Sequence, residues 1–359
     1  MAIRMGMRIT RLIFLLLLPI SMCGQQPKSL SLFFVGDLMQ HQAQIEAALC
    51  NDGSYDYGHC FSLVKERISR ADFAIGNLEV TLGGKPYRGY PQFSAPDEFL
   101  YAIKDAGFDI LATANNHSLD RHHRGLERTL TLIDSAGLEA IGTYHNADDR
   151  THRYPLIIEK NGIRIALLCA TYGTNGIATR PPNIVNRLNR EELSEDIRTA
   201  RRMKADAIIA IVHWGNEYQQ QPTEEQRNLA HWLISQGVDH IIGSHPHVIQ
   251  PVELIPHTDY PTHHAVIYSL GNYISNMSIA HSTVGLTVEL TIEKIGPTTR
   301  LKHFDHQLVW TERATLSKTK NFRIIPEDTI PSDLTSDAQQ HMQRAIDTER
   351  MFLKSILHK

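Results

Sequence analysis

Residues 206–217 read DAIIAIVHWGNE, an apolar run that ends abruptly in polar side chains. Six successive apolar residues, four of them β-branched, are typical of a strand that is buried on both faces. The run stops at His213, so a histidine, a glycine and an acidic residue follow the predicted strand at its carboxyl end. A strand of this kind indicates a sheet that is covered on both sides.

The same form recurs along most of the chain. Apolar runs of strand length occupy residues 31–36, 72–77, 108–114, 164–170, 239–243 and 264–270. Between them lie amphipathic stretches at residues 61–71, 125–137, 190–204 and 223–237. Several of these stretches start at Ser, Thr or Asn, and several end at Gly. Capped helices that alternate with buried strands predict an α/β fold with helices over the faces of the sheet.

The C-terminal part of the chain has a different pattern. Residues 285–294 and 300–310 indicate two antiparallel strands joined by a turn at Gly296-Pro297. Residues 334–357 have the pattern of a terminal helix. Because the chain has no Pro- or Ser-rich linker and no internal repeat, a single large domain is the simplest organisation.

Composition excludes several classes of protein. The chain has 359 residues, 42% of them hydrophobic, with 36 Lys and Arg against 39 Asp and Glu. This near balance argues against a basic nucleic-acid groove and against an acidic disordered tail. Histidine is the unusual count, since 20 histidines exceed the 12 tyrosines and 11 phenylalanines. Imidazole serves as metal ligand and as acid or base, although abundance alone is equally compatible with surface histidines.

The first 22 residues are predicted to be a secretory signal. Three arginines precede an apolar segment of 11 residues, 12–22, which is shorter than the roughly 20 needed to span a bilayer. Cys23 follows at once and resembles the acylated cysteine of a lipoprotein signal, although Met22 replaces the usual small residue. A lipid anchor at Cys23 and a plain secretory signal are the two alternatives, and both predict an exported mature chain.

The three remaining cysteines do not form a metal-binding pattern. Cys50 and Cys60 bracket a turn-rich segment, and a disulfide and two free thiols are equally compatible with that spacing in an exported protein. Cys169 lies inside the apolar run IALLCA and is predicted to be a core residue.

Polar residues gather where the predicted strands end, most of them beside a glycine. The segments are GDLMQH at 36–41, GNLE at 76–79, ANNHSLD at 114–120, HWGNE at 213–217, GSHPH at 243–247 and GNY at 271–273. In α/β folds ligands bind outside the carboxyl ends of strands, so these side chains are expected to meet in one crevice. Carboxylate, amide and imidazole groups form a ligand set for Mn, Zn or Fe. Six or seven ligands are more than one tetrahedral zinc ion uses. The number matches a pair of ions that share a bridging carboxylate.

Each segment alone also has a purely structural interpretation. Asp37 after a glycine could be a helix N-cap, and Asn115-Asn116-His117 could be a turn. The His245-Pro246-His247 segment is more specific, because alternate residues of an extended chain point to one side. Only the joint occurrence of the segments in this order indicates a metal centre.

The ordered segments resemble the capsule-synthesis family typified by CapA, within the calcineurin-like metallophosphoesterases. The motifs are VGDLMQH, AIGNLEV, ATANNHSLD, VHWGNEY, GSHPHVIQPVE and YSLGNYIS. The resemblance covers residues 30–310, with residues 311–359 as a C-terminal extension. It implies a four-layer α/β/β/α sandwich with two central mixed sheets and with the site at one edge.

The resemblance also implies roles for individual residues. The implied metal ligands, for one or two divalent ions, are Asp37, Glu79, Asn116, His213, His245 and His247. His117 is the implied acid for the leaving oxygen, and Asp120 would orient it. The first histidine of the superfamily pattern is replaced by Met39, which puts the first metal site in doubt. His41 is an alternative ligand in its place.

The resemblance leaves some polar and aromatic residues without a ligand role. These residues are expected to form the substrate-binding wall: Trp214, Glu217, Asn272 and Tyr273. Packing is the alternative role for Trp214.

The implied activity is metal-dependent hydrolysis of a phosphoester. Two alternatives remain, a scaffold that binds an anionic polymer such as poly-γ-glutamate without turnover and an inactive metallophosphatase-like domain. Membrane-bound capsule-synthesis proteins are expected partners and nucleic acid is not. Membrane contact is expected only through a lipid anchor, with the protein at the periplasmic or outer face of the cell envelope.

Overall fold

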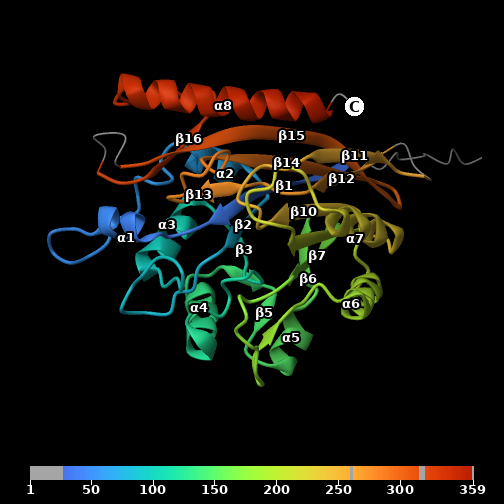
Figure 1. Cartoon of the computed structure of the whole chain (residues 1–359). Coiled ribbons are helices and arrows are strands. Elements are labelled where there is room, and N and C mark those ends of the chain that lie inside the picture. The colour runs from blue at the N-terminus through green and yellow to red at the C-terminus, as the bar shows by residue number, and fades with distance from the viewer. Residues whose placement is uncertain (1–26, 259–261, 315–319, 358–359) are drawn as a thin grey trace, which may run out of the picture.

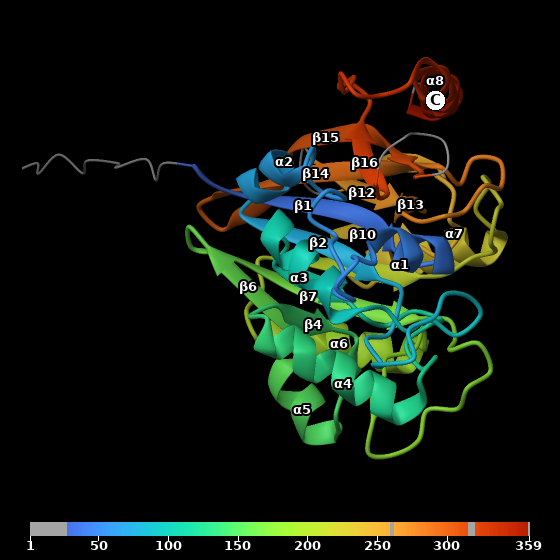
Figure 2. The ribbon, with the colours of Figure 1, turned by 90° about the vertical axis from the view of Figure 1, so that its left-hand side faces the viewer.

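The computed structural model describes residues 27–258, 262–314 and 320–357. The predicted signal segment, residues 1–22, and Cys23 lie outside the described residues. Two sheets lie face to face at the centre of the molecule (Figure 1), and strand β1 of the first sheet contacts β7 and β10 of the second. Helix α8 (Ser336–Leu357) runs along the outer side of the first sheet, α4 (His122–Ser135) packs on the edge strand of that sheet, and α5 (Ala147–Arg153) and α6 (Arg190–Arg202) lie on the side of the second (Figure 2). The predicted α/β/β/α sandwich with two mixed sheets is confirmed.

The first sheet has eight strands in the order β16-β15-β14-β1-β2-β3-β4, with β13 also paired to β1. Strand β1 is parallel to β2 and β13 and antiparallel to β14, so the sheet is mixed. The strands are β1 (Lys28–Leu38), β2 (Phe73–Leu78), β3 (Ile110–Ala112), β4 (Glu139–Ile141), β13 (Asn272–Ile274), β14 (Val284–Ile295), β15 (Thr298–Glu312) and β16 (Arg323–Pro326).

The second sheet has six strands in the order β11-β12-β10-β9-β7-β6. Its four central strands are parallel, and β6 and β11 pair antiparallel at the two edges. The strands are β6 (Leu156–Lys160), β7 (Ile163–Thr171), β9 (Ala207–His213), β10 (His240–Ser244), β11 (Val252–Pro256) and β12 (His263–Ile267). A small separate sheet pairs β5 (Thr143–Tyr144) with β8 (Ile184–Val185). All seven residues of β9 are buried, as its continuous apolar run predicts.

The helices are α1 (Gln42–Ala48), α2 (Lys65–Arg70), α3 (Asp97–Ala106), α4 (His122–Ser135), α5 (Ala147–Arg153), α6 (Arg190–Arg202), α7 (Glu224–Ser235) and α8 (Ser336–Leu357). The predicted terminal helix is therefore confirmed as α8, and it packs on β14 and β15. Asn189 and Thr223 cap α6 and α7 through their side chains, as the sequence predicts. Short elements such as α1, β4 and β13 carry no long periodic pattern and were not predicted.

The long antiparallel hairpin of β14 and β15 is also confirmed. Its turn lies at Gly296, whose φ of 60° is in the left-handed region that glycine adopts without strain. Strand β16 extends the same sheet, so residues beyond 310 are built into the first sheet rather than appended to it. Within the described residues, no helix combines the length and the apolar character that crossing a membrane requires.

Two glycines bring strand ends into close contact at the edge where the polar segments lie. A Cβ atom at Gly36 would lie 1.9 Å from the Gly271 carbonyl oxygen, and one at Gly243 would lie 2.1 Å from the Tyr268 carbonyl oxygen. Such distances exclude any side chain, so the glycines allow β1 to approach β13 and β10 to approach the segment after β12. The glycine that precedes several polar segments in the sequence thus has a packing role.

The three cysteines among the described residues are free. Cys50 is half-buried, and Cys60 and Cys169 are buried. Of the two alternatives for Cys50 and Cys60, the structure therefore has two thiols rather than a disulfide. Burial raises the pKa of the Cys169 thiol to about 12, as expected for a core residue.

Candidate metal centre

The carboxyl ends of strands from both sheets meet in one buried cluster. Asp37 lies near the end of β1 and Glu79 directly follows β2, while His213 ends β9 in the facing sheet. His245 and His247 follow β10 in the loop GSHPH. All five side chains belong to residues that are at most 3% exposed. The two sheets face each other, so their polar strand ends converge as the sequence pattern predicts.

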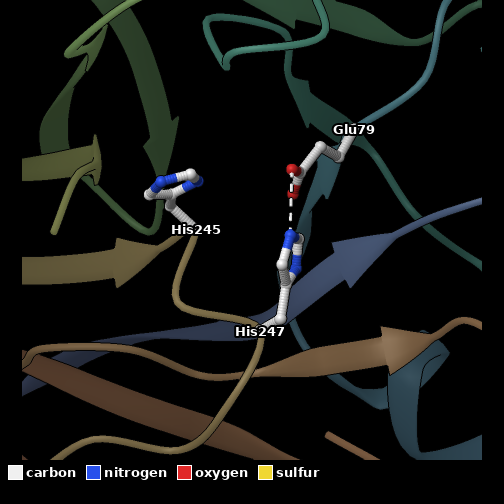
Figure 3. Close-up of side chains that lie close together, drawn as sticks. All are labelled: Glu79, His245 and His247. Carbon is white, nitrogen blue, oxygen red and sulfur yellow. Dashed lines mark ion pairs between the residues drawn. The ribbon is translucent and has the colours of Figure 1, made fainter. Parts of the chain in front are cut away.

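Glu79, His245 and His247 lie close together, with an ion pair between Glu79 and His247 (Figure 3). The Oε1 atom of Glu79 is 3.7 Å from His213 Nε2 and 3.7 Å from His247 Nε2. This oxygen is buried and accepts no hydrogen bond from any described residue. The other oxygen, Oε2, accepts a hydrogen bond from Asn77 Nδ2 at 3.2 Å. Glu79 therefore presents a buried oxygen to two imidazole rings without a donor that satisfies it.

Two groups of three side chains have the spacing of metal ligands, and Glu79 belongs to both. One group is Glu79, His245 and His247, and the other is Asp37, Glu79 and His213. Within each group the ligand atoms lie within 4.8 Å of one another. A carboxylate that two ligand groups share is the arrangement of a bridging ligand between two cations.

Hydrogen bonds around the cluster orient its ligands. His247 Nδ1 lies 3.0 Å from Asp37 Oδ2 and 3.0 Å from Asn272 Oδ1. Both partners are acceptors, so Nδ1 carries the proton and Nε2 presents a lone pair toward Glu79. Asn77 Nδ2 donates to Asp37 Oδ1 at 2.7 Å, which orients that carboxylate.

The electrostatics of the cluster favour a bound cation. Burial and the neighbouring carboxylate of Asp37 raise the pKa of Glu79 well above its usual value. Burial and His245 hold the pKa of His213 well below its usual value, and burial and His247 lower the pKa of His245 to about 3. The ion pairs of Asp37 and Glu79 among the described residues are with histidines alone. Neutral imidazoles and buried carboxylates without a lysine or arginine fit a divalent metal ion.

His245 supplies a second buried atom that lacks a partner. Its Nδ1 is buried and has no hydrogen bond to any described residue. The residue also adopts a φ of 102°, a conformation that side chains other than glycine rarely take. Backbone strain at a buried, unpartnered imidazole is consistent with a ligand position.

His117 and Asp120 form a separate acid–base pair beside the cluster. His117 Nδ1 lies 2.7 Å from Asp120 Oδ2, and Asp120 Oδ2 also accepts the Phe93 N–H at 2.7 Å. Burial raises the pKa of Asp120, against the opposing effect of His117. Asn116, the residue before His117, contacts the cluster through Oδ1, 2.9 Å from His213 Nε2. The structure thus brings the predicted acid and the predicted ligands together.

The predicted wall residues divide between the site and the core. Asn272 lies in the cluster through its contact with His247. Tyr273, the next residue of β13, points the opposite way, is 1% exposed and packs 6.2 Å from the ring of Phe108. Its expected substrate role is therefore wrong, because successive residues of a strand face opposite sides. Glu217 is exposed near the site, and its charge contributes to the raised pKa of Glu79.

Trp214 is mainly a packing residue. It is 2% exposed, and its indole Nε1 donates to the Tyr268 carbonyl oxygen at 2.8 Å. Its remaining surface contributes to a cleft of about 990 Å³ that extends from Tyr172 to the N-terminus of α7. The packing alternative thus describes this side chain better than the expected substrate-wall role.

His41 does not replace the histidine that the family pattern lacks. It occupies the N-cap position of α1, and its Nδ1 lies 3.2 Å from Gln44 Oε1. Its ring packs edge-on against Phe93 at 5.3 Å, and burial lowers its pKa to about 4. It belongs to neither three-residue group, so the structure places it as a capping residue. Met39 is completely buried.

Several residues of the site were not predicted. Asn77 and Asn115 link the strand ends, with Asn115 Nδ2 donating to Asn77 Oδ1 at 3.2 Å. Tyr172 is half-exposed and lies 4.6 Å from the ring of His245. Asn77 and Asn115 already stand inside the strand-end segments of the sequence. Tyr172 follows β7 and precedes Gly173, but no acidic residue, asparagine or histidine stands directly beside it, so the pattern of polar strand ends does not indicate it.

The solved structures to which this chain is similar include phosphoesterases and nucleotidases. The calcineurin-like phosphoesterase YfkN from Bacillus subtilis has a TM-score of 0.47 and 15% identity, over 90% of this chain and 100% of that chain. The NAD nucleotidase NadN from Haemophilus influenzae has a TM-score of 0.49 and 12% identity, over 91% of this chain and 56% of that chain.

Two of the sequence relatives are named as capsule or PGA biosynthesis proteins. The chain is 28% identical to the capsule biosynthesis protein CapA of Bacillus anthracis, over 70% of this chain and 61% of that protein. It is 27% identical to the PGA biosynthesis protein CapA of Bacillus subtilis, over 74% of this chain and 69% of that protein. The match thus spans less than two thirds of the Bacillus anthracis protein. The family described as bacterial capsule synthesis protein PGA_cap matches residues 31–277, which contain every residue of the cluster. The chain therefore belongs to the bacterial capsule synthesis protein PGA_cap family.

Proposed function

We propose that the cluster is the metal centre of a phosphoesterase-like hydrolase that acts in capsule or poly-γ-glutamate synthesis. The observation that carries this proposal is Glu79, a buried carboxylate shared by two ligand groups, with an oxygen that no donor satisfies. A buried carboxylate in that state costs stability unless a cation binds it.

The proposed ligands are oxygen and imidazole nitrogen atoms, a set that suits Mn, Zn or Fe. Asp37, Glu79 and His213 would hold one ion, and Glu79, His245 and His247 the other. Bound divalent ions of this kind activate water and offset charge on a phosphoryl group. The hydrogen bond between His247 Nδ1 and Asp37 keeps the His247 Nε2 lone pair available.

His117 is the proposed general acid. Asp120 accepts the hydrogen bond of His117 Nδ1–H at 2.7 Å, so Nε2 is the ring nitrogen that can exchange a proton with a leaving group. The Phe93 N–H, bound to the same oxygen of Asp120, holds the carboxylate in place. General acid assistance of this type contributes a factor of about 10²–10⁴ in rate.

The biological setting is proposed from the relatives. The two CapA relatives are named for capsule and PGA biosynthesis, which supports a role at the cell envelope. We propose that the mature protein is exported, with a lipid anchor at Cys23 as an additional feature, and works beside membrane-bound synthesis proteins. Its substrate would be a phosphoester or an anionic polymer.

The test is a comparison of metal content and turnover in three proteins, the wild type, H117A and H247A. Each protein is loaded with Mn, analysed for bound metal and assayed on phosphomonoesters, phosphodiesters and γ-glutamyl peptides. We expect H117A to keep its metal and to lose a factor of about 10² or more in turnover, since only the acid is removed. H247A should lose both metal and turnover, and equal activity in all three proteins would refute the proposal.

A second candidate function is a polymer-binding scaffold without turnover. It is favoured by Met39, which stands where the superfamily pattern has a histidine and so removes one ligand. In the same assays a scaffold would bind poly-γ-glutamate tightly and hydrolyse none of the substrates, whether or not metal is present. Turnover that a chelator abolishes would exclude it.

A further inference from the structure

Three exposed tyrosines surround the buried metal centre. Tyr90 is 74% exposed, Tyr172 is 49% exposed and Tyr218 is 38% exposed. Tyr172 and Tyr218 nevertheless lie beside rings of the cluster histidines, and Tyr90 lies beside the ring of Phe93. They come from three separate loops, which follow β2, β7 and β9. We call Tyr90, Tyr172 and Tyr218 the tyrosine rim.

Tyr172 and Tyr218 lie over the histidines of the cluster. The Tyr172 ring is 4.6 Å from the His245 ring and is nearly parallel to His213, at 6.2 Å with an angle of 9° between the planes. The Tyr218 ring is 6.1 Å from that of His247. Each predicted ligand histidine thus has an exposed aromatic ring beside it.

Tyr90 reaches the acid–base pair through Phe93. The rings of Tyr90 and Phe93 are 6.3 Å apart in an edge-on arrangement, and the rings of Phe93 and His117 are 4.7 Å apart. Phe93 is completely buried, so Tyr90 is the exposed end of this stack. The proposed leaving-group side of the site is therefore also bordered by an aromatic ring.

The backbone holds Tyr218 in a strained conformation. Its φ is 63°, in the left-handed region that residues other than glycine seldom adopt. Its N–H donates to the Pro246 carbonyl oxygen at 2.8 Å, between the two histidines of the GSHPH loop. Strain of this kind persists where the surrounding structure fixes the position of a side chain, and it is frequent at binding sites.

The electrostatics of the rim disfavour an extended polyanion. Glu217, the exposed residue before Tyr218, places a negative charge beside the rim, and the cleft beside Tyr172 is lined by Glu224 and Glu225 together with one arginine, Arg187. A groove for a polycarboxylate would instead need arginines and lysines along its length. Aromatic faces beside a metal centre bind flat or ring-shaped neutral groups by stacking.

From these contacts we infer that the site takes a phosphoester whose leaving group carries a ring, which stacks on the tyrosine rim while the phosphoryl group faces the metal centre. This inference rests on the proposed function for the location of the phosphoryl group. It adds the chemical class of the leaving group and three specificity-determining residues.

The experiment compares ligands that differ only in the ring. Mn-loaded protein is titrated calorimetrically with 2-phenylethylphosphonate and with ethylphosphonate, which cannot be hydrolysed as phosphoesters. The corresponding phosphate esters are assayed for turnover, and their leaving alcohols have similar reactivity. We expect the wild type to prefer the phenyl compound by roughly 10-fold or more in Kd and in KM.

Variants assign that preference to the rim. Y172A and Y218A should each lower the ratio of the two Kd values by roughly 3- to 10-fold, and Y90A should lower it less. Y172F and Y218F should keep the ratio, because the ring remains. Y101A is the matched control, since Tyr101 on α3 is 51% exposed and outside the rim, and it should leave the ratio unchanged.

The outcomes separate this inference from the proposed function. A retained ring preference in binding without any turnover would refute the hydrolase and support the rim. Equal affinity for both phosphonates, or binding of neither, would overturn the inference. Displacement of the phenyl compound by a short poly-γ-glutamate at lower concentration than by ethylphosphonate would also overturn it, since the rim would then recognise a polyanion.

Discussion

Glu79 and Glu349 are both buried glutamates beside histidines, yet their surroundings differ. Glu349 on α8 is 1% exposed, with Oε1 2.6 Å from His281 Nδ1 and Oε2 accepting from Gln220 Nε2 at 3.1 Å. Glu79 is completely buried, and its Oε1 has histidines only at 3.7 Å. Protein side chains contact both carboxylate oxygens of Glu349, whereas Oε1 of Glu79 accepts no hydrogen bond from any described residue. The comparison separates a structural carboxylate from one that is arranged for a ligand.

The surroundings of the two histidine partners lead to the same conclusion. The His281 side chain is 34% exposed, so water can solvate its ion pair with Glu349. The side chains of His213 and His247 are 1% exposed. Glu349 also ties α8 to Gln220, in the loop that carries Tyr218, so the satisfied carboxylate supports the site from outside the matched family region.

The largest expected effect is that of E79Q on metal affinity. Removing the shared carboxylate should weaken Mn binding by more than about 100-fold, measured by calorimetric titration. The metal-free E79Q protein should nevertheless be more stable than the metal-free wild type, by about 1–3 kcal/mol in urea unfolding, because the wild type must either bury the charge of Glu79 or take up a proton there on folding. E349Q serves as the control and should bind Mn as the wild type does. A metal-free E79Q protein that is less stable than the wild type would contradict the assignment.

The E349A change is expected to lower the stability of the protein, whereas E79Q raises the stability of the metal-free protein. This change leaves Gln220 and His281 without their partner, and it should lower the free energy of unfolding by about 1–3 kcal/mol. Urea unfolding measures the loss, and Mn titration should show an affinity close to that of the wild type. If E349A loses metal binding while remaining folded, Glu349 acts on the site directly and the distinction between the two glutamates fails.

The smallest effect is the pH dependence that Glu349 contributes. Burial raises the pKa of Glu349 above its usual value, against the opposing effects of His281 and Gln220. Between the unfolded and the folded pKa, the native protein binds more protons than the unfolded chain, so this contribution to stability falls as the pH rises. The unfolding free energy of the wild type minus that of E349Q should therefore decrease with rising pH from about 4.5. If this difference in unfolding free energy instead rises with pH above about 4.5, the pKa of Glu349 is lowered in the folded protein rather than raised.

The convergence of the polar strand ends was largely predictable, because a strand end is a local feature. Continuous apolar runs predict buried strands, and the polar residue after each run predicts a ligand at a shared edge. The structure brings Asp37 and His247 to 3.0 Å from each other although they are 210 positions apart in the chain. These two residues meet because the two sheets pack face to face. No local sequence pattern specifies that packing.

The errors at the site have a common physical origin. Tyr273 and its neighbour Asn272 were both expected in the substrate wall, but the alternation of a strand turns the Tyr273 ring toward Phe108. The alternative ligand His41 stands two residues after Met39, but it is the N-cap residue of α1 and contacts Gln44. In both cases proximity in sequence was an unreliable guide to the direction of a side chain.

The sequence by itself determined the alternation of strands and helices, the polar strand ends and the resemblance to the capsule-synthesis family. These properties depend on the periodicity and order of residues, which are local and need no knowledge of packing. Only the tertiary structure decided that Glu79 is shared by two groups of candidate ligands, that Glu349 is satisfied and that three exposed tyrosines lie around the candidate metal centre. These properties depend on loops and helices from distant parts of the chain, and their distances are set when two sheets and α8 pack together.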